Sequence, residues 1–354
     1  MRDIYPCFDL YIDGGMSSIY FYNALRFSTH GEYRVFVANE NTDWFKPFPH
    51  HQLITNFDIG SLKLHSKESF NIKFNKDRFN IFSKKTIQHY DVELLDGCIE
   101  ININSFLNFE KFLTKYLYYV DYLIDFEKKF IFLGVYKNNA SIIFRDNIFT
   151  DIANNLERLV KNKVDLTGSS ILTLKCKRMG DKLIIKYFIN KFSNRFELYR
   201  ACGINTPLLL IQSLLKRKVE VVLMVNCAYI KQIGGRIEYI FQDSCYVFDL
   251  DETLICRGVA VKELIKIFKK IKAIGFRVEL LTRHALDIDK ALIGIGLHKK
   301  DFDLIKKVEV NEKKSEFIKK GSIFIDNEFP QRKDVRVNSN CNVLDLDQID
   351  FLNL

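Results

Sequence analysis

Residues 245–354 predict an α/β fold in which helices cover both faces of a parallel, Rossmann-like sheet. Two observations support this prediction: short apolar runs recur along the stretch, and amphipathic segments separate them. The predicted strands are Tyr246–Leu250, Arg277–Leu281, Lys307–Val310, Ser322–Ile325 and Asn342–Leu344, and the predicted helices are Val261–Ile274, His284–Ile293, Glu312–Lys319 and Gln331–Val337. Alternation of this kind is typical of sheets buried on both faces, whose catalytic side chains lie at the carboxyl ends of the strands.

The sequence of residues 1–244 indicates a separate α+β region. We therefore expect two domains, 1–244 and 245–354. The predicted elements are strand-rich segments at Ile54–Phe79 and Tyr90–Ile103, hairpins that pair Phe130–Val135 with Ala140–Phe144 and Ile171–Cys176 with Lys182–Ile189, and helices at Ser105–Leu123, Asp151–Lys161 and Leu208–Leu215. No flexible Gly/Ser/Pro-rich linker joins the two domains. We therefore expect the first region to be rigidly attached and to cover the strand ends of the second.

Composition narrows the class of protein. The chain of 354 residues has a formal charge of +9, and the basic excess lies mostly in the first 244 residues, without long blocks of like charge. This pattern favours a solvated basic surface over a nucleic-acid track. The eight cysteines form no CxxC pair and no zinc-ligand spacing. Because no signal-peptide core and no run of roughly 18 apolar residues is present, we expect a cytoplasmic protein without a membrane partner.

A pair of carboxylates follows the first predicted strand of the second domain. The sequence from Phe248 to Leu254 is Phe-Asp-Leu-Asp-Glu-Thr-Leu, which places Asp249 and Asp251 two residues apart at the strand end. If the chain turns there, one carboxylate can attack phosphorus while the other transfers the leaving-group proton. This is the division of labour that a covalent phosphoryl intermediate requires.

Further polar residues follow in a fixed order. Thr282 ends the second predicted strand, Lys314 precedes the strand Ser322–Ile325, and Asp326 follows that strand. With the DxDxT motif, these elements resemble the haloacid dehalogenase (HAD) superfamily over the whole of residues 245–354. The resemblance implies a magnesium-dependent phosphomonoester hydrolase that works through an aspartyl phosphate.

The resemblance assigns catalytic roles to four residues. Asp249 is the implied nucleophile, and Asp251 the implied general acid and base. Thr282 and Lys314 are expected to hold the phosphoryl oxygens, and Lys314 also offsets negative charge around the nucleophile. Lys313 is the neighbouring alternative to Lys314.

The resemblance also implies a Mg²⁺ site built from oxygen donors. The expected ligands are Asp249, Asp326, the backbone carbonyl of Asp251, and Asn327. Many members carry a second acid where this chain has Asn327, so we expect weaker metal binding here. Thr253 and Arg283 are the candidates for substrate contacts, and Thr253 is expected chiefly to buttress its loop.

The spacing of the motifs leaves no room for a cap domain. About 28 residues separate Thr253 from Thr282, and about 31 separate Thr282 from Lys314. Family members that act on small metabolites usually carry a cap in one of these gaps. We therefore expect an open site, unless another part of the chain or a partner covers it.

A second resemblance lies between about residues 95 and 218. The stretches Leu166–Leu172, Leu183–Asn190 and Ala201–Leu210 are similar to the end of ATP-grasp ligase domains. Phe188 replaces the metal-binding glutamate of that family, and Lys191-Phe192 replaces its Pro-Arg pair. The resemblance therefore implies a degenerate ATP-grasp-like domain without ordinary ligase activity. The segment Asp13–Ser18 is either a phosphate-binding loop or a turn.

The sequence thus predicts a phosphatase of a small phosphorylated biosynthetic metabolite. The open site and the basic first region support one alternative, a phosphatase of a protein or nucleic-acid end. Another alternative is a bifunctional ATP-grasp ligase–phosphatase. Nucleic acid is the less favoured partner. The sequence does not indicate whether the protein is a monomer or an oligomer.

Overall fold

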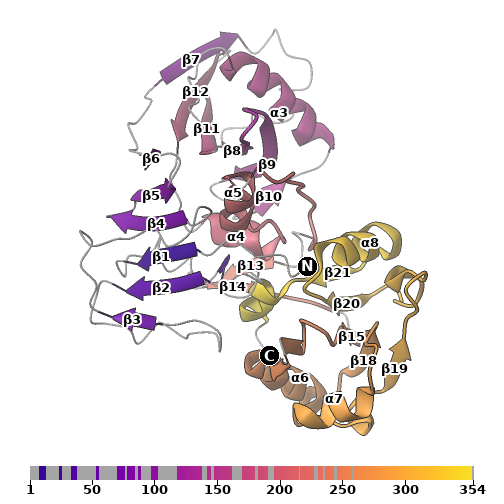
Figure 1. Cartoon of the computed structure of the whole chain (residues 1–354). Coiled ribbons are helices and arrows are strands. Elements are labelled where there is room, and N and C mark those ends of the chain that lie inside the picture. Colours follow the sequence, from indigo (N-terminus) through magenta and orange to yellow (C-terminus); the bar gives the residue numbers. More distant parts are fainter. Residues whose placement is uncertain are drawn as a thin grey trace. The chain divides into compact units, whose positions relative to one another are not determined.

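The chain divides into two compact units (Figure 1). The computed structural model describes residues 8–12, 24–25, 33–37, 53–55, 70–75, 78–83, 87–88, 97–102, 118–137, 142–144, 147–161, 170–179, 182–189, 195–214, 216–226, 230–233, 236–242, 245–256 and 258–352. The first unit comprises Met1–Tyr199 and Asn205–Val221, and the second comprises Arg200–Ile204 and Val222–Leu354. The second unit therefore begins upstream of the domain boundary predicted between residues 244 and 245.

A mixed sheet near the amino terminus belongs to the first unit. Its strands are β1 (Phe8–Ile12), β2 (Tyr33–Val37), β3 (Leu53–Thr55), β4 (Phe70–Asn75), β5 (Arg78–Ser83) and β6 (Ile87–Gln88), in the order β3-β2-β1-β4-β5-β6. Strand β1 pairs in parallel with β2 and β4, whereas β4 and β5 form an antiparallel pair. Strands β3, β4 and β5 lie in or at the edge of the predicted strand-rich segment Ile54–Phe79. The segment Asp13–Ser18 lies outside the described residues.

The first unit also holds an antiparallel sheet. Its strands are β7 (Gly97–Asn102), β8 (Tyr118–Ile124), β9 (Phe130–Lys137), β10 (Ile142–Phe144), β11 (Ser170–Met179) and β12 (Lys182–Ile189), in the order β10-β9-β8-β11-β12-β7. Both predicted hairpins are confirmed, because β9 pairs with β10 and β11 pairs with β12. The apolar stripe of helix α3 (Asn147–Val160) packs on one face of this sheet.

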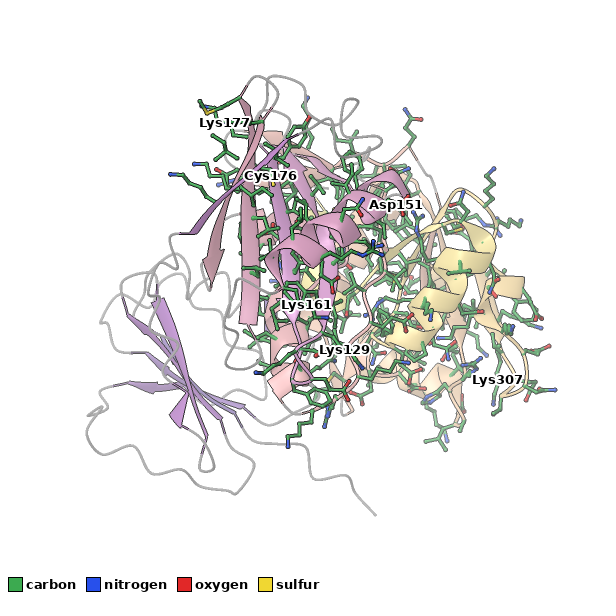
Figure 2. The ribbon with its side chains drawn as sticks, turned by 90° about the horizontal axis from the view of Figure 1, so that it is seen from above. Lys129, Asp151, Lys161, Cys176, Lys177 and Lys307 are labelled. Atoms are coloured by element: carbon green, nitrogen blue, oxygen red, sulfur yellow. The ribbon has the colours of Figure 1, made fainter. Side chains whose placement is uncertain are left out.

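Two neighbouring side chains near the end of β11 point to opposite faces of the sheet. Cys176 points towards α3 and is fully buried, whereas the next residue, Lys177, points away and is exposed (Figure 2). Burial raises the pKa of the Cys176 thiol to about 12. The thiol is therefore a packing group and not a nucleophile.

One prediction for the first unit is wrong. The segment Ser105–Leu123 is expected to be helical from its sequence. Residues 105–117 lie outside the described residues, but Tyr118–Ile124 forms β8, which is nearly completely buried between β9 and β11. Its sequence, Tyr-Tyr-Val-Asp-Tyr-Leu-Ile, is rich in aromatic and branched residues that favour strands. Helices α4 (Arg195–Ala201) and α5 (Thr206–Leu214) follow later in the chain, and α5 confirms the helix predicted at Leu208–Leu215.

The second unit confirms the predicted parallel sheet. Its strands are β15 (Cys245–Phe248), β18 (Arg277–Thr282), β19 (Leu304–Lys307), β20 (Ser322–Ile325) and β21 (Asn342–Leu344), in the order β19-β18-β15-β20-β21. Every neighbouring pair is parallel. Strands β18 and β20 are buried along almost their whole length, as expected of a sheet that is covered on both faces.

Helices cover both faces of this sheet (Figure 1). Phe248 of β15 packs edge-on against Phe268 of helix α6 (Lys262–Ile274), at 5.6 Å between ring centroids. The preceding residue, Val247, lies in a cluster with Val335 of helix α8 (Phe329–Ser339). Because adjacent strand residues point to opposite faces, α6 and α8 lie on opposite sides. Gly275 ends α6 at a φ of +92°, a conformation that glycine adopts without strain.

Three predicted elements differ in extent from those observed. Strand β19 lies a few residues before the predicted Lys307–Val310. Helix α7 (Ile288–Gly294) begins four residues after the predicted start, because Asp287 caps it by accepting hydrogen bonds from backbone N–H groups. The predicted helix Glu312–Lys319 is only a short 3₁₀ turn, η5 (Lys314–Glu316). Each difference lengthens a loop at the carboxyl edge of the sheet.

Smaller elements complete the second unit. They are the hairpins β13 (Ile230–Ile233) with β14 (Arg236–Tyr239) and β16 (Ile255–Cys256) with β17 (Val259–Ala260), and the 3₁₀ helices η4 (Lys299–Asp301) and η6 (Leu346–Phe351). Residues 222–226 run beside β21, where Val343 donates its N–H to the Met224 carbonyl at 3.0 Å. None of the helices in the described parts of the chain is both long and apolar enough to cross a bilayer.

Candidate active site

Polar side chains converge at the carboxyl edge of the parallel sheet. Asp249 directly follows β15, and Asp326 directly follows the neighbouring strand β20. The chain leaves β15 towards β18 on one side and returns to β20 on the other, so the two aspartates lie where the strand order reverses. Ligand sites in open parallel sheets form at such switch points.

A buried lysine bridges these two carboxylates. The Lys314 ammonium lies 2.8 Å from Oδ1 of Asp249 and 2.7 Å from Oδ2 of Asp326. Lys314 is 3% exposed, Asp249 is 6% exposed and Asp326 is fully buried. Lys313, the alternative considered from the sequence, is exposed. The fold therefore brings Asp249, Lys314 and Asp326 into one charge cluster.

The electrostatics of the cluster are unbalanced. Burial and the neighbouring Asp326 carboxylate raise the pKa of Asp249 to about 7, although Lys314 acts in the opposite direction. Burial opposes the charged form of Lys314, but the Asp326 and Asp249 carboxylates outweigh it and raise the pKa of Lys314. A single ammonium thus does not offset two buried carboxylates, and the site favours additional positive charge.

The loop after β15 turns sharply to present Asp251. Glu252 adopts a φ of +53°, which is uncommon for a residue other than glycine and often marks a functional turn. The Asp251 side chain is 50% exposed, and its Oδ1 lies 2.7 Å from Nδ1 of His284. The His284 ring is only 14% exposed. Sequence reasoning missed His284, which stood inside a predicted helix and outside every motif.

Thr253 ties the two aspartate loops together. Its fully buried hydroxyl lies 3.2 Å from Oδ1 of Asn327, to which it donates, and it accepts a hydrogen bond from the Asn327 backbone N–H at the same distance. These contacts are structural ones between loops, as expected of a buttress. The amide oxygen of Asn327 is thereby occupied by a protein donor.

The Asp326 loop is held from the α8 side. The Glu328 N–H donates to Oδ1 of Asp326 at 2.7 Å, and the Arg332 guanidinium donates to the Asp326 carbonyl at 2.8 Å. Arg332 also forms a 2.6 Å ion pair with Asp345, which directly follows β21. Arg332 was likewise missed from sequence, because nothing in a helix pattern shows which residue reaches back to a loop.

Thr282 and Arg283 stand beside the cluster. Thr282 is fully buried, and its hydroxyl accepts a hydrogen bond from the His284 N–H at 3.0 Å. Arg283 donates to the Glu312 carbonyl at 2.6 Å, which links the loops after β18 and β19. In the described residues, neither side chain forms a hydrogen bond or ion pair with Asp249, Lys314 or Asp326.

The oxygen atoms of Asp249 and Asp326 are the candidate metal donors at this edge of the sheet. No group of three or more His, Cys, Asp or Glu side chains in those residues is arranged to hold a metal ion. The two carboxylates of Asp249 and Asp326 are hard oxygen donors, and Mg²⁺ needs only one or two carboxylates when waters and phosphate complete its shell. The donor set therefore fits Mg²⁺ and not a zinc site.

Comparison with known proteins adds no family assignment. No protein-family model, curated protein or solved structure matches the chain.

Proposed function

We propose that the chain is a phosphomonoesterase of the HAD type, with Asp249 as nucleophile. The observation that carries the proposal is the Lys314 ammonium that bridges Asp249 and Asp326, two buried carboxylates at the ends of adjacent parallel strands. Structural ion pairs are usually balanced, whereas this one leaves Asp249 with a strongly raised pKa. Buried, perturbed carboxylates at a switch point favour catalysis over a purely structural role.

In the first step, an Asp249 carboxylate oxygen attacks phosphorus as the bond to the leaving oxygen breaks. Asp251 donates a proton to that oxygen, and an aspartyl phosphate remains on Asp249. In the second step, water attacks phosphorus while Asp251 accepts its proton. The bond to Asp249 then breaks, which releases phosphate and restores both carboxyl groups.

The surroundings of Asp249 suit this chemistry. Lys314 stabilises negative charge as it develops on the phosphoryl group, and burial keeps water from screening that interaction. Asp249, Asp326 and the Asp251 carbonyl would hold Mg²⁺. When bound, the ion supplies the positive charge that the cluster lacks and orients the phosphate oxygens.

We propose a small phosphorylated biosynthetic metabolite as substrate. In residues 245–256 and 258–352, only a short hairpin, α6, α7, η4, β19 and η5 connect the site strands β15, β18 and β20, so this stretch contributes no inserted domain over the site. That openness by itself suits a larger substrate too, and the charge pattern decides between the two. The positive charge of the chain is spread out and not gathered in blocks. Such a distribution favours a small anion over a nucleic-acid end.

The test is hydrolysis of 4-nitrophenyl phosphate by the full chain, with Mg²⁺ and with EDTA. We expect activity to require Mg²⁺ and Asp249→Asn to reduce kcat by more than about 1,000-fold, since an amide cannot form the acyl phosphate. Asp289→Asn, at a half-exposed aspartate of α7, is the matched control and should leave kcat unchanged. Full turnover in chelator, or an active Asp249→Asn protein, would contradict the proposal.

A further inference from the structure

His284 contacts the carboxyl group that the proposed reaction uses for proton transfer. Nδ1 of His284 lies 2.7 Å from Oδ1 of Asp251, a short hydrogen bond between loops 33 residues apart in sequence. Oδ2 of Asp251 has no hydrogen-bond partner among the described residues. One carboxyl oxygen is thus held, and the other is left for the leaving group.

The environment of the pair is asymmetric. The Asp251 side chain is half exposed and directly precedes the turn at Glu252, so packing alone does not fix its rotamer. The His284 ring is 14% exposed, and its backbone N–H is anchored on the buried Thr282 hydroxyl at 3.0 Å. The better anchored residue therefore orients the freer one.

We propose that His284 is a positioning residue for proton transfer by Asp251, an inference that rests on the proposed phosphatase function. Its Nδ1–H donates to Oδ1 of Asp251 and directs Oδ2 towards the leaving oxygen. As phosphorus bonds to Asp249 and the ester bond breaks, the Oδ2 proton moves to the leaving oxygen. The Asp251 carboxylate so formed keeps the hydrogen bond from His284 until the attacking water returns a proton to Oδ2.

This role makes a selective prediction about leaving groups. A nitrophenolate leaves without help because the anion is stable, whereas phenolate needs a proton in the transition state. General acid catalysis contributes about 100-fold to 10,000-fold when the leaving group is poor. Loss of His284 should therefore slow the hydrolysis of phenyl phosphate much more than that of 4-nitrophenyl phosphate.

The experiment compares kcat/KM for the two esters in the full chain with Mg²⁺, because kcat/KM reports the step in which the ester bond breaks. His284→Leu and His284→Ala remove the donor, and His284→Asn keeps an N–H near the Nδ1 position. We expect either donor-free variant to lower kcat/KM about 30-fold for phenyl phosphate and only about 3-fold for 4-nitrophenyl phosphate. His284→Asn should restore most of the difference.

Two controls separate positioning from general damage. His298→Ala removes an exposed histidine of the same unit and should change neither ester. In an Asp251→Asn background, His284→Leu should have no further effect on the ratio of the two esters, because His284 acts through Asp251.

Equal losses on the two esters, or an undiminished effect of His284→Leu in the Asp251→Asn background, would overturn the inference while leaving the phosphatase function standing. A wild-type chain that hydrolyses neither ester would overturn the proposed function itself.

Discussion

Two buried aspartates, one in each compact unit, are accommodated in different ways. Asp121 lies within the antiparallel sheet and is fully buried, and it accepts hydrogen bonds from the hydroxyls of Thr173 at 2.6 Å and Tyr199 at 2.9 Å. Asp249 follows a parallel strand, and its partner is the ammonium of Lys314, which it shares with Asp326. Two neutral hydroxyls donate to the first carboxylate, and competing charges surround the second.

The difference separates a structural acid from a candidate catalytic one. Asp121 sits inside a strand, where its hydrogen bonds fix the packing of β8, β11 and α4. Asp249 sits at a strand end, where the loops of the sheet meet and its pKa is raised to about 7. Burial alone therefore does not mark an active site; an unbalanced charge at the carboxyl edge of a parallel sheet is the informative signal.

The largest effect should follow from removing the shared ammonium. Lys314→Met leaves two buried carboxylates without a counter-charge, so we expect activity to fall by more than about 1,000-fold and the free energy of unfolding by roughly 2–4 kcal/mol. Kinetics and chemical denaturation measure the two effects. The control is Lys313→Met, at the exposed neighbouring position, which should be nearly neutral in both. If the two variants behaved alike, the charge cluster would not matter as described.

A smaller effect, on stability alone, is expected at the structural acid. Asp121→Asn keeps the shape but replaces one acceptor by a donor, which should lower the free energy of unfolding by about 1–3 kcal/mol. The kcat of the folded protein should not change. Denaturation and phosphatase assays below the melting transition test this expectation, and a specific loss of kcat would show that Asp121 is not purely structural.

The same substitution at Asp249 should stabilise the metal-free protein. The folded-state pKa of about 7 exceeds the unfolded value of 3.8, so the folded protein holds the proton more tightly and loses stability as pH rises between these values. Above pH 7 the penalty is complete. Asp249→Asn removes it, and we expect a gain of about 1–3 kcal/mol at pH 8 in EDTA that vanishes near pH 4.

Asp303 provides a control of opposite sign for this pH dependence. The Val278 N–H and the Lys272 ammonium lower the pKa of Asp303, so its contribution to stability is present at neutral pH and is lost as pH falls through the folded-state pKa. Asp303→Asn should therefore destabilise the protein at pH 8. Thermal melts of both variants across pH measure the contrast, and a destabilised Asp249→Asn protein at pH 8 would contradict the electrostatic account.

Much of the parallel sheet could be predicted from sequence, because its central strands contain short apolar runs such as Tyr246–Phe248 and Ile323–Ile325. The helix at Tyr118–Leu123 was mispredicted, since a short apolar segment carries no period that separates helix from strand. The late start of α7 had a local signal, Asp287, whose side chain caps the helix. The pairing of residues 222–226 with β21 depends on contacts more than 100 residues apart, and no local pattern encodes it.

The candidate site could be predicted in part. Asp249 and Asp326 converge because strand ends in a parallel sheet must meet at one edge, and Lys314 reaches them from η5. The contacts made by His284 and Arg332 could not be predicted, because loop length does not determine side-chain direction. Two expectations stay predictions: that residues 1–244 cover the site, and that the region of about residues 95–218 is similar to ATP-grasp domains.

The most direct test of the central claim is chemical trapping of the phosphorylated residue. The full chain is mixed with 4-nitrophenyl phosphate and Mg²⁺, quenched within one turnover and reduced with borohydride, which converts an aspartyl phosphate into homoserine. Tandem mass spectrometry then locates the modified residue. We predict substrate-dependent homoserine at position 249 and nowhere else in the chain. Homoserine at another aspartate, or product release without any modification at position 249, would contradict the assignment of Asp249 as nucleophile.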